Sequence, residues 1–209
     1  MTALTDLRAE VVPHVPGCPL PMVDAAILKA VIDFCIRSRA YRFNPAAITT
    51  VAGTADYSIS DLPTGYEIAW LLSAELDDVP LQIAASGVLP LGWETETGAP
   101  SYALRKSATQ IGLRVVPDSS GSMLVRLALR PSAAATTYPD ELHAIYQEGI
   151  AAGALARIWA QPKRAWTNME MVSDARSRFE DAIASAEYRA DRGFSNAPAR
   201  TALNLIGGR

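Results

Sequence analysis

The amino-acid sequence predicts an α+β fold, in which N- and C-terminal segments form a helical bundle around an inserted antiparallel β module. Near both ends of the chain, apolar residues recur at every third or fourth position, which is typical of amphipathic helices. Between these segments the apolar runs are short and divided by turn residues, which favours strands. We expect a bundle from residues 1–45 and 132–192, a small sandwich or barrel-like sheet from 46–131, and an extended C-terminal arm from 193–209.

Composition excludes several classes of protein. The chain has 209 residues, of which 49% are hydrophobic, and a net charge of −3, so it is neither disordered throughout nor a simple basic nucleic-acid binder. No apolar run reaches the roughly 20 residues that a membrane span needs, and the start lacks the pattern of a signal peptide. We therefore expect a protein made in a cytoplasm. Cys18 and Cys35 are expected as two buried thiols, with a disulfide between them as the alternative.

The first helical segment contains a short helix and a long one. Thr5 and Asp6 are suited to cap the short helix, which prolines and a glycine interrupt by position 17. Pro21 then lies near the first turn of a helix of about five turns. Its apolar stripe is formed by Val23, Ile27, Val31 and Phe34. A basic stretch at residues 37–42 follows it, which suits the negative end of a helix dipole.

The middle segment reads as a meander of short strands. Asp77 and Asp78 form a hairpin tip rather than a calcium site, and residues 84–99 appear as an irregular connection between strands. In the last strand, apolar and polar residues alternate, so one face is predicted to be buried. The predicted strands are 47–51, 56–59, 66–76, 79–83, 101–106, 110–116 and 122–129.

The C-terminal segment predicts two further helices. The first begins at Pro139–Glu141 and runs to Pro162; the second begins with a capping box at Thr167 and runs to Arg192. Within the first, Gly149 and Gly153 each cost about 1 kcal/mol relative to alanine, so a neighbouring helix should approach closely there. We assign this packing face to Gly149, Gly153, Ala156 and Trp159. The sequence leaves open whether the neighbour belongs to the same subunit or to another copy.

The sequence offers little for catalysis, and we predict no enzyme, cofactor or metal site. His14 and His143 are the only histidines, and neither a nucleophile turn nor a phosphate-binding glycine loop occurs. A small hydrolase using one of these histidines with a carboxylate partner is a minor alternative. A host protein- or carbohydrate-binding module that uses Trp70 or Trp93 is another, although we read these tryptophans as core or interface anchors.

Several stretches, taken in order, resemble a known family. They are Pro16–Pro21 with the following helix, Val51–Tyr57 with Leu62–Gly65, and Thr137–Leu142 with Ile150–Ala156 and Gln161–Asn168. Together they are similar to the head–tail adaptor (connector) proteins of tailed bacteriophages, of the tail tubular protein A or upper-tail-tube type. The likeness extends over about residues 5 to 192.

This resemblance implies a structural role in the virion neck, after assembly in the host cytoplasm. Such proteins form a dodecameric ring, of twelve copies, that joins the portal protein to a tail, nozzle or stopper protein, and DNA passes through without specific binding. No membrane is involved. The arm that docks on the portal would use Phe194, Arg200, Leu203, Leu205, Ile206 and Arg209. An acidic lumen that repels DNA would be lined by candidates Asp24, Asp140, Glu141 and Glu148.

Overall fold

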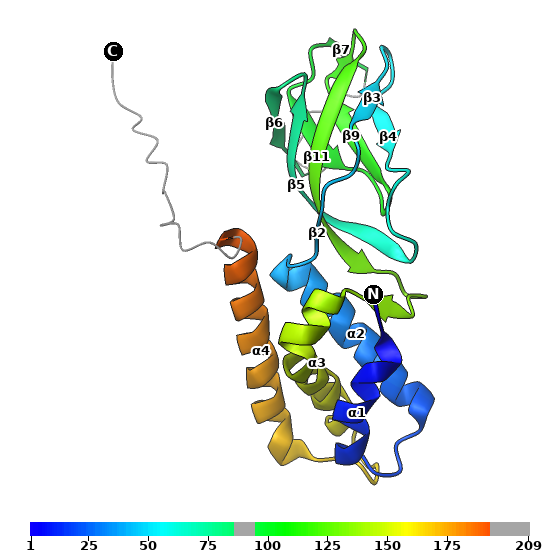
Figure 1. The fold of residues 1–209 in the computed structure, drawn as a ribbon, viewed down its shortest axis with the longest axis vertical. Coiled ribbons are helices and arrows are strands. Elements are labelled where there is room, and N and C mark those ends of the chain that lie inside the picture. Colours follow the sequence, from blue (N-terminus) through cyan, green and yellow to red (C-terminus); the bar gives the residue numbers. More distant parts are fainter. Residues whose placement is uncertain (86–94, 193–209) are drawn as a thin grey trace, which may run out of the picture.

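A computed structural model describes residues 1–85 and 95–192 (Figure 1). Figure 1 shows an elongated molecule with helices at one end and strands at the other. The predicted α+β class is confirmed. Trp93 and the six predicted arm residues lie outside the described residues.

Four α-helices make up the helical end. The short helix α1 (Arg8–Val11) is flanked by the 3-10 turns η1 (Leu4–Leu7) and η2 (Val12–His14), and the long helices are α2 (Leu20–Ser38), α3 (Asp140–Trp159) and α4 (Met169–Arg192). Proline stands at the N-cap of both α2 and α3, where extended backbone enters the helix. Arg39 ends α2 in the left-handed region at φ 52°, and its N–H group bonds to the Cys35 carbonyl.

One curled, eight-stranded sheet makes up most of the other end. Its centre is the long antiparallel pair β5 (Tyr66–Leu76) and β11 (Gly121–Pro131). The other strands are β2 (Arg42–Phe43), β3 (Ile48–Thr50), β4 (Asp56–Ser58), β6 (Val79–Ile83), β8 (Tyr102–Arg105) and β9 (Gln110–Arg114). Two small pairs stand apart: β1 (Thr2–Ala3) with β12 (Thr137–Tyr138), and β7 (Thr97–Gly98) with β10 (Val116–Pro117).

The expectation of a wholly antiparallel meander is wrong at two places. Strands β6 and β8 pair in parallel, with Gln82 opposite Tyr102, and β7 also pairs with β10 in parallel. A tight hairpin enforces antiparallel pairing, whereas a connection of a dozen or more residues permits parallel pairing. The chain between β6 and β8 is long enough for such a crossover.

Two separate clusters of buried apolar side chains stabilise these parts. One joins α1, α2, α3 and α4 around residues such as Phe34, Ile150 and Ile158, which are fully buried. The other is formed by the strands of the sheet, and its members Leu127 and Leu129 are fully buried. The domain boundaries predicted from the sequence remain a prediction.

The two cysteines differ in their surroundings. Both are free thiols; Cys35 is buried in the helical cluster, but Cys18 is partly exposed, so the expectation of two buried thiols holds only for Cys35. Burial raises the pKa of the Cys35 thiol to about 12, which keeps it protonated and unreactive.

Candidate interaction surfaces

Helices α3 and α4 approach each other closely at the two predicted glycines. A Cβ atom added at Gly149 would lie 2.3 Å from the Cβ of Ala182, and one added at Gly153 would lie 2.6 Å from the ring of Phe179. Both contacts are too short for a real side chain, so the helix spacing requires glycine. The neighbouring helix that the glycines admit is therefore α4 of the same chain.

Ala156 and Trp159, the other predicted packing residues, are buried within the chain. The indole N–H group of Trp159 donates a hydrogen bond to the His14 carbonyl at 3.2 Å, which ties the end of α3 to the N-terminal segment. Only 7% of Trp159 is exposed, so this side chain offers little surface to another copy. Its packing belongs to the chain's own core.

A groove lies open beside the glycine contact. It encloses about 420 Å³ and is lined by Ile145, Tyr146, Glu148, Gly149, Arg178, Asp181, Ala182, Ser185 and Arg189. We call it the α3–α4 groove. Gly149, Ala182 and Ser185 line it with small side chains, while Ile145 is 39% exposed. Such a floor of small residues beside an exposed apolar side chain suits close contact with another surface.

Some charged side chains around this groove have a partner within the described residues and others do not. Arg178 forms an ion pair with Asp174 at 3.0 Å, and the guanidinium of Arg189 lies 5.8 Å from the ring centre of Tyr146. Within residues 1–85 and 95–192, the carboxylates of Glu148 and Asp181 form no ion pair. The groove therefore holds two carboxylates without an ion-pair partner in the described residues, together with the guanidinium groups of Arg178 and Arg189.

The four acidic lumen candidates divide into two pairs. Asp24 receives two hydrogen bonds from Arg8, at 2.7 and 2.6 Å, and Asp140 is bound by the N-terminal ammonium at 2.5 Å and by the Thr2 hydroxyl at 2.6 Å. These hydrogen bonds, that of the N-terminal ammonium first, hold the pKa of Asp140 below its usual range. Both charges are thus largely balanced locally.

Glu141 and Glu148 differ from that pair. They are exposed and stand seven residues apart on α3, so they share one face of the helix, whereas Asp24 lies on α2. The structure brings together only these two of the four candidates as an exposed acidic face.

The end of α4, from which the predicted arm continues, is held at the junction of helices and sheet. Arg37 pairs with Glu180, Arg39 with Glu187, and Arg42 of β2 with Asp191, the last at 2.8 Å. From the sequence alone, the basic residues at positions 37–42 were expected only to interact favourably with the negative end of the α2 dipole. Its acidic partners lie about 140 to 150 residues away, which local patterns do not reveal.

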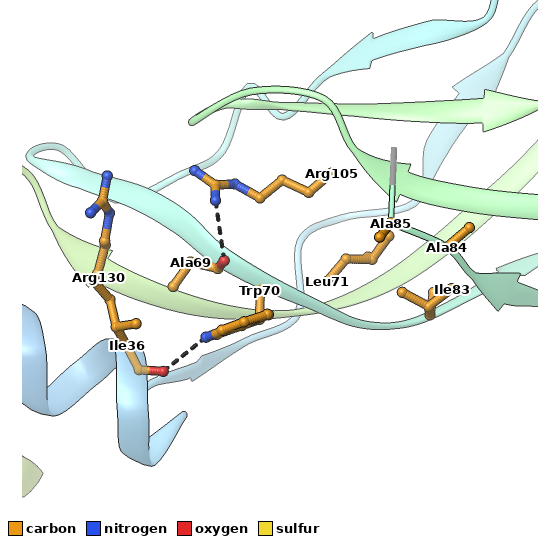
Figure 2. A pocket seen from close by; sticks show the side chains of 9 residues that line it. All are labelled: Ile36, Ala69, Trp70, Leu71, Ile83, Ala84, Ala85, Arg105 and Arg130. Atoms are coloured by element: carbon orange, nitrogen blue, oxygen red, sulfur yellow. Dashed lines mark hydrogen bonds between the residues drawn. The ribbon is translucent and has the colours of Figure 1, made fainter. Parts of the chain in front are cut away.

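A cavity of about 430 Å³ lies at this junction (Figure 2). It is lined by Ile36 of α2, by Ala69, Trp70 and Leu71 of β5, by Ile83, Ala84 and Ala85, and by Arg105 and Arg130. The indole N–H group of Trp70 donates to the Ile36 carbonyl at 2.8 Å, and Arg105 donates to the Ala69 carbonyl at 3.4 Å (Figure 2). Trp70 is 49% exposed and connects the two ends of the molecule.

The two histidines lie in unrelated places. His143 Nδ1 and the hydroxyl of the buried Tyr138 share a hydrogen bond of 2.5 Å, whereas His14 packs edge-on against Trp159, with ring centres 6.4 Å apart. His143 and Trp159 stand at opposite ends of α3, about 24 Å apart at 1.5 Å per residue. The structure therefore does not bring the histidines into one site.

The described part of the chain lacks two features of other protein classes. Among residues 1–85 and 95–192, no helix has both the length and the apolar character that crossing a bilayer requires. In the same residues, no three histidine, cysteine or acidic side chains gather as metal ligands would.

Comparison with known proteins gives one informative result. A search of curated proteins finds no significant match. The family model for the SU10 adaptor protein, in contrast, matches residues 2–202, a span that includes the helices, the sheet and the surfaces described above. Because this match covers nearly the whole chain, the protein belongs to the SU10 adaptor protein family and is a structural phage adaptor protein of the virion.

Proposed function

We propose that this adaptor forms a ring beneath the portal of the filled capsid, joins the capsid to the tail at the neck, and gives DNA a passage. The observation that carries the proposal is the family match over residues 2–202, since an adaptor acts by binding other components of the virion. The molecule supplies suitable parts: an elongated shape, a glycine-packed helix pair and interaction surfaces at its helical end and junction. We further propose that residues 1–45 with 132–192 and residues 46–131 are its two domains.

The C-terminal segment 193–209 is proposed as the portal-binding arm. Its anchors would be the apolar residues Phe194, Leu203, Leu205 and Ile206, and Arg200 and Arg209 would contact acidic groups of the portal. The three ion pairs between α4 and residues 37–42 support this role, because they fix the C-terminal half of α4, and the pair of Arg42 with Asp191 fixes its last turn. A segment that orders on binding can cover a large partner surface from such a fixed starting point.

The DNA passage is proposed to be acidic. Glu141 is the best candidate for the lumen, because it is exposed on α3 and forms no ion pair with the described residues, whereas Glu148 lines the α3–α4 groove. Negative charge keeps phosphates from binding and lets the duplex slide. Asp24 and Asp140 would contribute less, because Arg8 and the N-terminal ammonium balance them.

The test is electron microscopy of assembled portal mixed with the full-length protein and with a variant ending at Arg192. We expect the full-length protein to add a ring-shaped layer to the portal and the truncated one to be missing from it. Within the described residues, α4 and the sheet each have a buried apolar cluster, so the truncated protein should keep their circular dichroism spectrum. Normal portal binding by the truncated protein would exclude the arm assignment, and absence of any layer with the full-length protein would exclude the ring.

A further inference from the structure

Helix α2 is apolar on the side that faces away from the bundle. Ala25, Leu28, Ile32 and Ile36 follow one another at steps of three and four, so they share this outer side. Ala25 is exposed, the other three are partly exposed, and Leu20 at the start of the helix is 50% exposed. Leu28 packs partly against the helical cluster, and Ile36 lines the junction cavity beside Trp70. Ala25 and Ile32 therefore carry the open apolar surface of this side, which we call the α2 outer face.

The α2 outer face and the α3–α4 groove lie on opposite sides of the bundle. On α3, Tyr146 and Arg157 face α2: the ring of Tyr146 lies 5.2 Å from that of Phe34, and Arg157 pairs with Asp33 at 2.7 Å. At about 100° per residue, Glu148 points from α3 in nearly the opposite direction to these two. The buried stripe of α2 faces α3, so its outer face points away from α3 on the other side.

Opposite faces are what a closed ring requires. In cyclic assemblies other than dimers, each subunit places one surface on a different surface of the next subunit, so the two surfaces must differ and match. The α2 outer face is a ridge of apolar side chains, and the groove has a floor of small residues beside the exposed Ile145. A side-chain ridge packing over small residues is the ordinary geometry of helix packing.

Their charges are also complementary. Lys29 stands exposed on the α2 outer face beside Leu28 and Ile32, and within the described residues it forms no ion pair. The groove presents the carboxylates of Glu148 and Asp181, which likewise have no ion-pair partner in that part of the chain. The groove also holds two arginines: Arg178 is paired with Asp174, and Arg189 lies over the ring of Tyr146. Lys29 would pair with the two carboxylates that have no such partner, which favours this contact and its orientation.

We propose that the α2 outer face of one copy packs into the α3–α4 groove of the next copy, with Lys29 beside Glu148 and Asp181. The inference rests on the proposed ring, and it names the two surfaces that close it. The apolar ridge provides the buried contact, and the charges set which neighbour and which register are accepted.

Site-directed cross-linking tests the contact directly. The full-length protein carries Ala25→Cys on the ridge and Ser185→Cys in the groove, in a Cys18→Ser background; both positions are exposed in one copy. Bound to portal and treated with a short bis-maleimide, it should give a ladder of covalent multimers. The matched control combines Ala25→Cys with Ser119→Cys, an exposed loop position far along the chain in the sheet, and should give none.

Charge reversal provides the second arm. Lys29→Glu should lower the yield of rings on the portal roughly tenfold, because it places like charges in contact. Adding Glu148→Lys and Asp181→Lys to the same chain should restore the yield, since every contact in the ring is then reversed. Circular dichroism confirms that each variant is folded.

The outcomes separate the inference from the proposed function. Rings that form normally without the Ala25–Ser185 cross-link, or with Lys29→Glu alone, would overturn the assignment of surfaces and leave the ring intact. A protein that neither binds the portal nor self-associates at any concentration would overturn the ring, and the inference with it.

Discussion

Helix α4 is attached to the rest of the molecule by two unlike surfaces. Along α3 the contact is so close that Gly149 and Gly153 have no room for a Cβ atom. Along α2 and β2, three arginines pair with three carboxylates whose side chains remain 42–59% exposed. The contact with α3 is close and apolar, whereas the ion pairs with α2 and β2 are exposed to solvent.

The difference separates stability from orientation. Close apolar packing contributes strongly to the folded state, whereas an exposed ion pair contributes about 0–1 kcal/mol. We therefore expect damage on the α3 side to unfold the bundle. Loss of the ion pairs with residues 37–42 should leave the bundle folded and release only the end of α4, from which the proposed portal-binding arm continues.

Phe34→Ala should cause the largest loss of stability. Phe34 is fully buried where α2, α3 and α4 meet, with ring centres 5.2 Å from Tyr146 and 6.4 Å from Phe179. Truncating it leaves a cavity and should lower the free energy of unfolding by about 3–5 kcal/mol, measured by urea denaturation. The control, Lys29→Ala on the exposed side of the same helix, should change it by less than about 0.5 kcal/mol. Similar effects from both variants would contradict the packing described for α2.

Gly149→Ala sharpens the contrast, because alanine is usually the better helix residue. Here its Cβ atom would lie 2.3 Å from the Cβ atom of Ala182. We expect the free energy of unfolding to fall by about 1–3 kcal/mol, despite the gain of about 1 kcal/mol in helix propensity. Adding Ala182→Gly removes the obstructing atom, so the double variant should regain most of the wild-type stability. A stabilising single substitution, read from the same urea curves, would show that the helices can separate without cost.

The same contrast explains which features the sequence could predict. Local signals predicted the three long helices: prolines before α2 and α3, and the apolar steps of Val172, Ala175 and Phe179 in α4. Alternation and turn residues predicted β5, β6 and β11. The two-residue strands β1, β2 and β12 were missed, because two residues are too few to show alternation.

Contacts between segments far apart in the chain could not be predicted from local sequence patterns. The glycines of α3 indicated a close neighbour, but nothing local identified Ala182 and Phe179 as the residues in contact. Likewise, the exposed Ile145 and the unpaired Glu148 became part of one groove only when α4 was placed beside α3. Trp70 was expected to be a core or interface anchor; it is 49% exposed, and its hydrogen bond to the carbonyl of Ile36 follows only from how α2 meets β5.

Trp70→Phe extends the comparison to the junction of helices and sheet. The substitution keeps an aromatic ring but removes the N–H group that donates to Ile36 at 2.8 Å. We expect the free energy of unfolding to fall by about 0.5–1.5 kcal/mol, the usual net contribution of one hydrogen bond. Hydrogen exchange should become faster at the last turn of α2 and unchanged at Ile150 within α3. Trp70→Phe variants with unaltered exchange at both places would show that this bond does not couple the two ends.

Arg37→Ala should have the smallest effect, and its dependence on pH is specific. The hydrogen bonds from Arg37 hold the pKa of Glu180 below its usual range, so the folded state favours the ionised carboxylate. That contribution is complete above the unfolded pKa of glutamate, about 4.3, and disappears as the pH falls through the lower folded value. Because the two side chains are 41% and 54% exposed, we expect a loss of no more than about 1 kcal/mol at pH 7, shrinking towards zero at pH 3 or in 1 M salt.

The matched control for this pair is Arg126→Ala, which removes an exposed arginine from β11 without touching α4. Its effect on urea denaturation should be small and independent of pH between 3 and 7. If Arg37→Ala destabilised the protein equally at both pH values, the cause would be lost packing of the arginine stem rather than the ion pair. The α2 side of α4 would then resemble the α3 side, and the division between a surface that stabilises and a surface that orients would no longer describe how this adaptor holds its last helix.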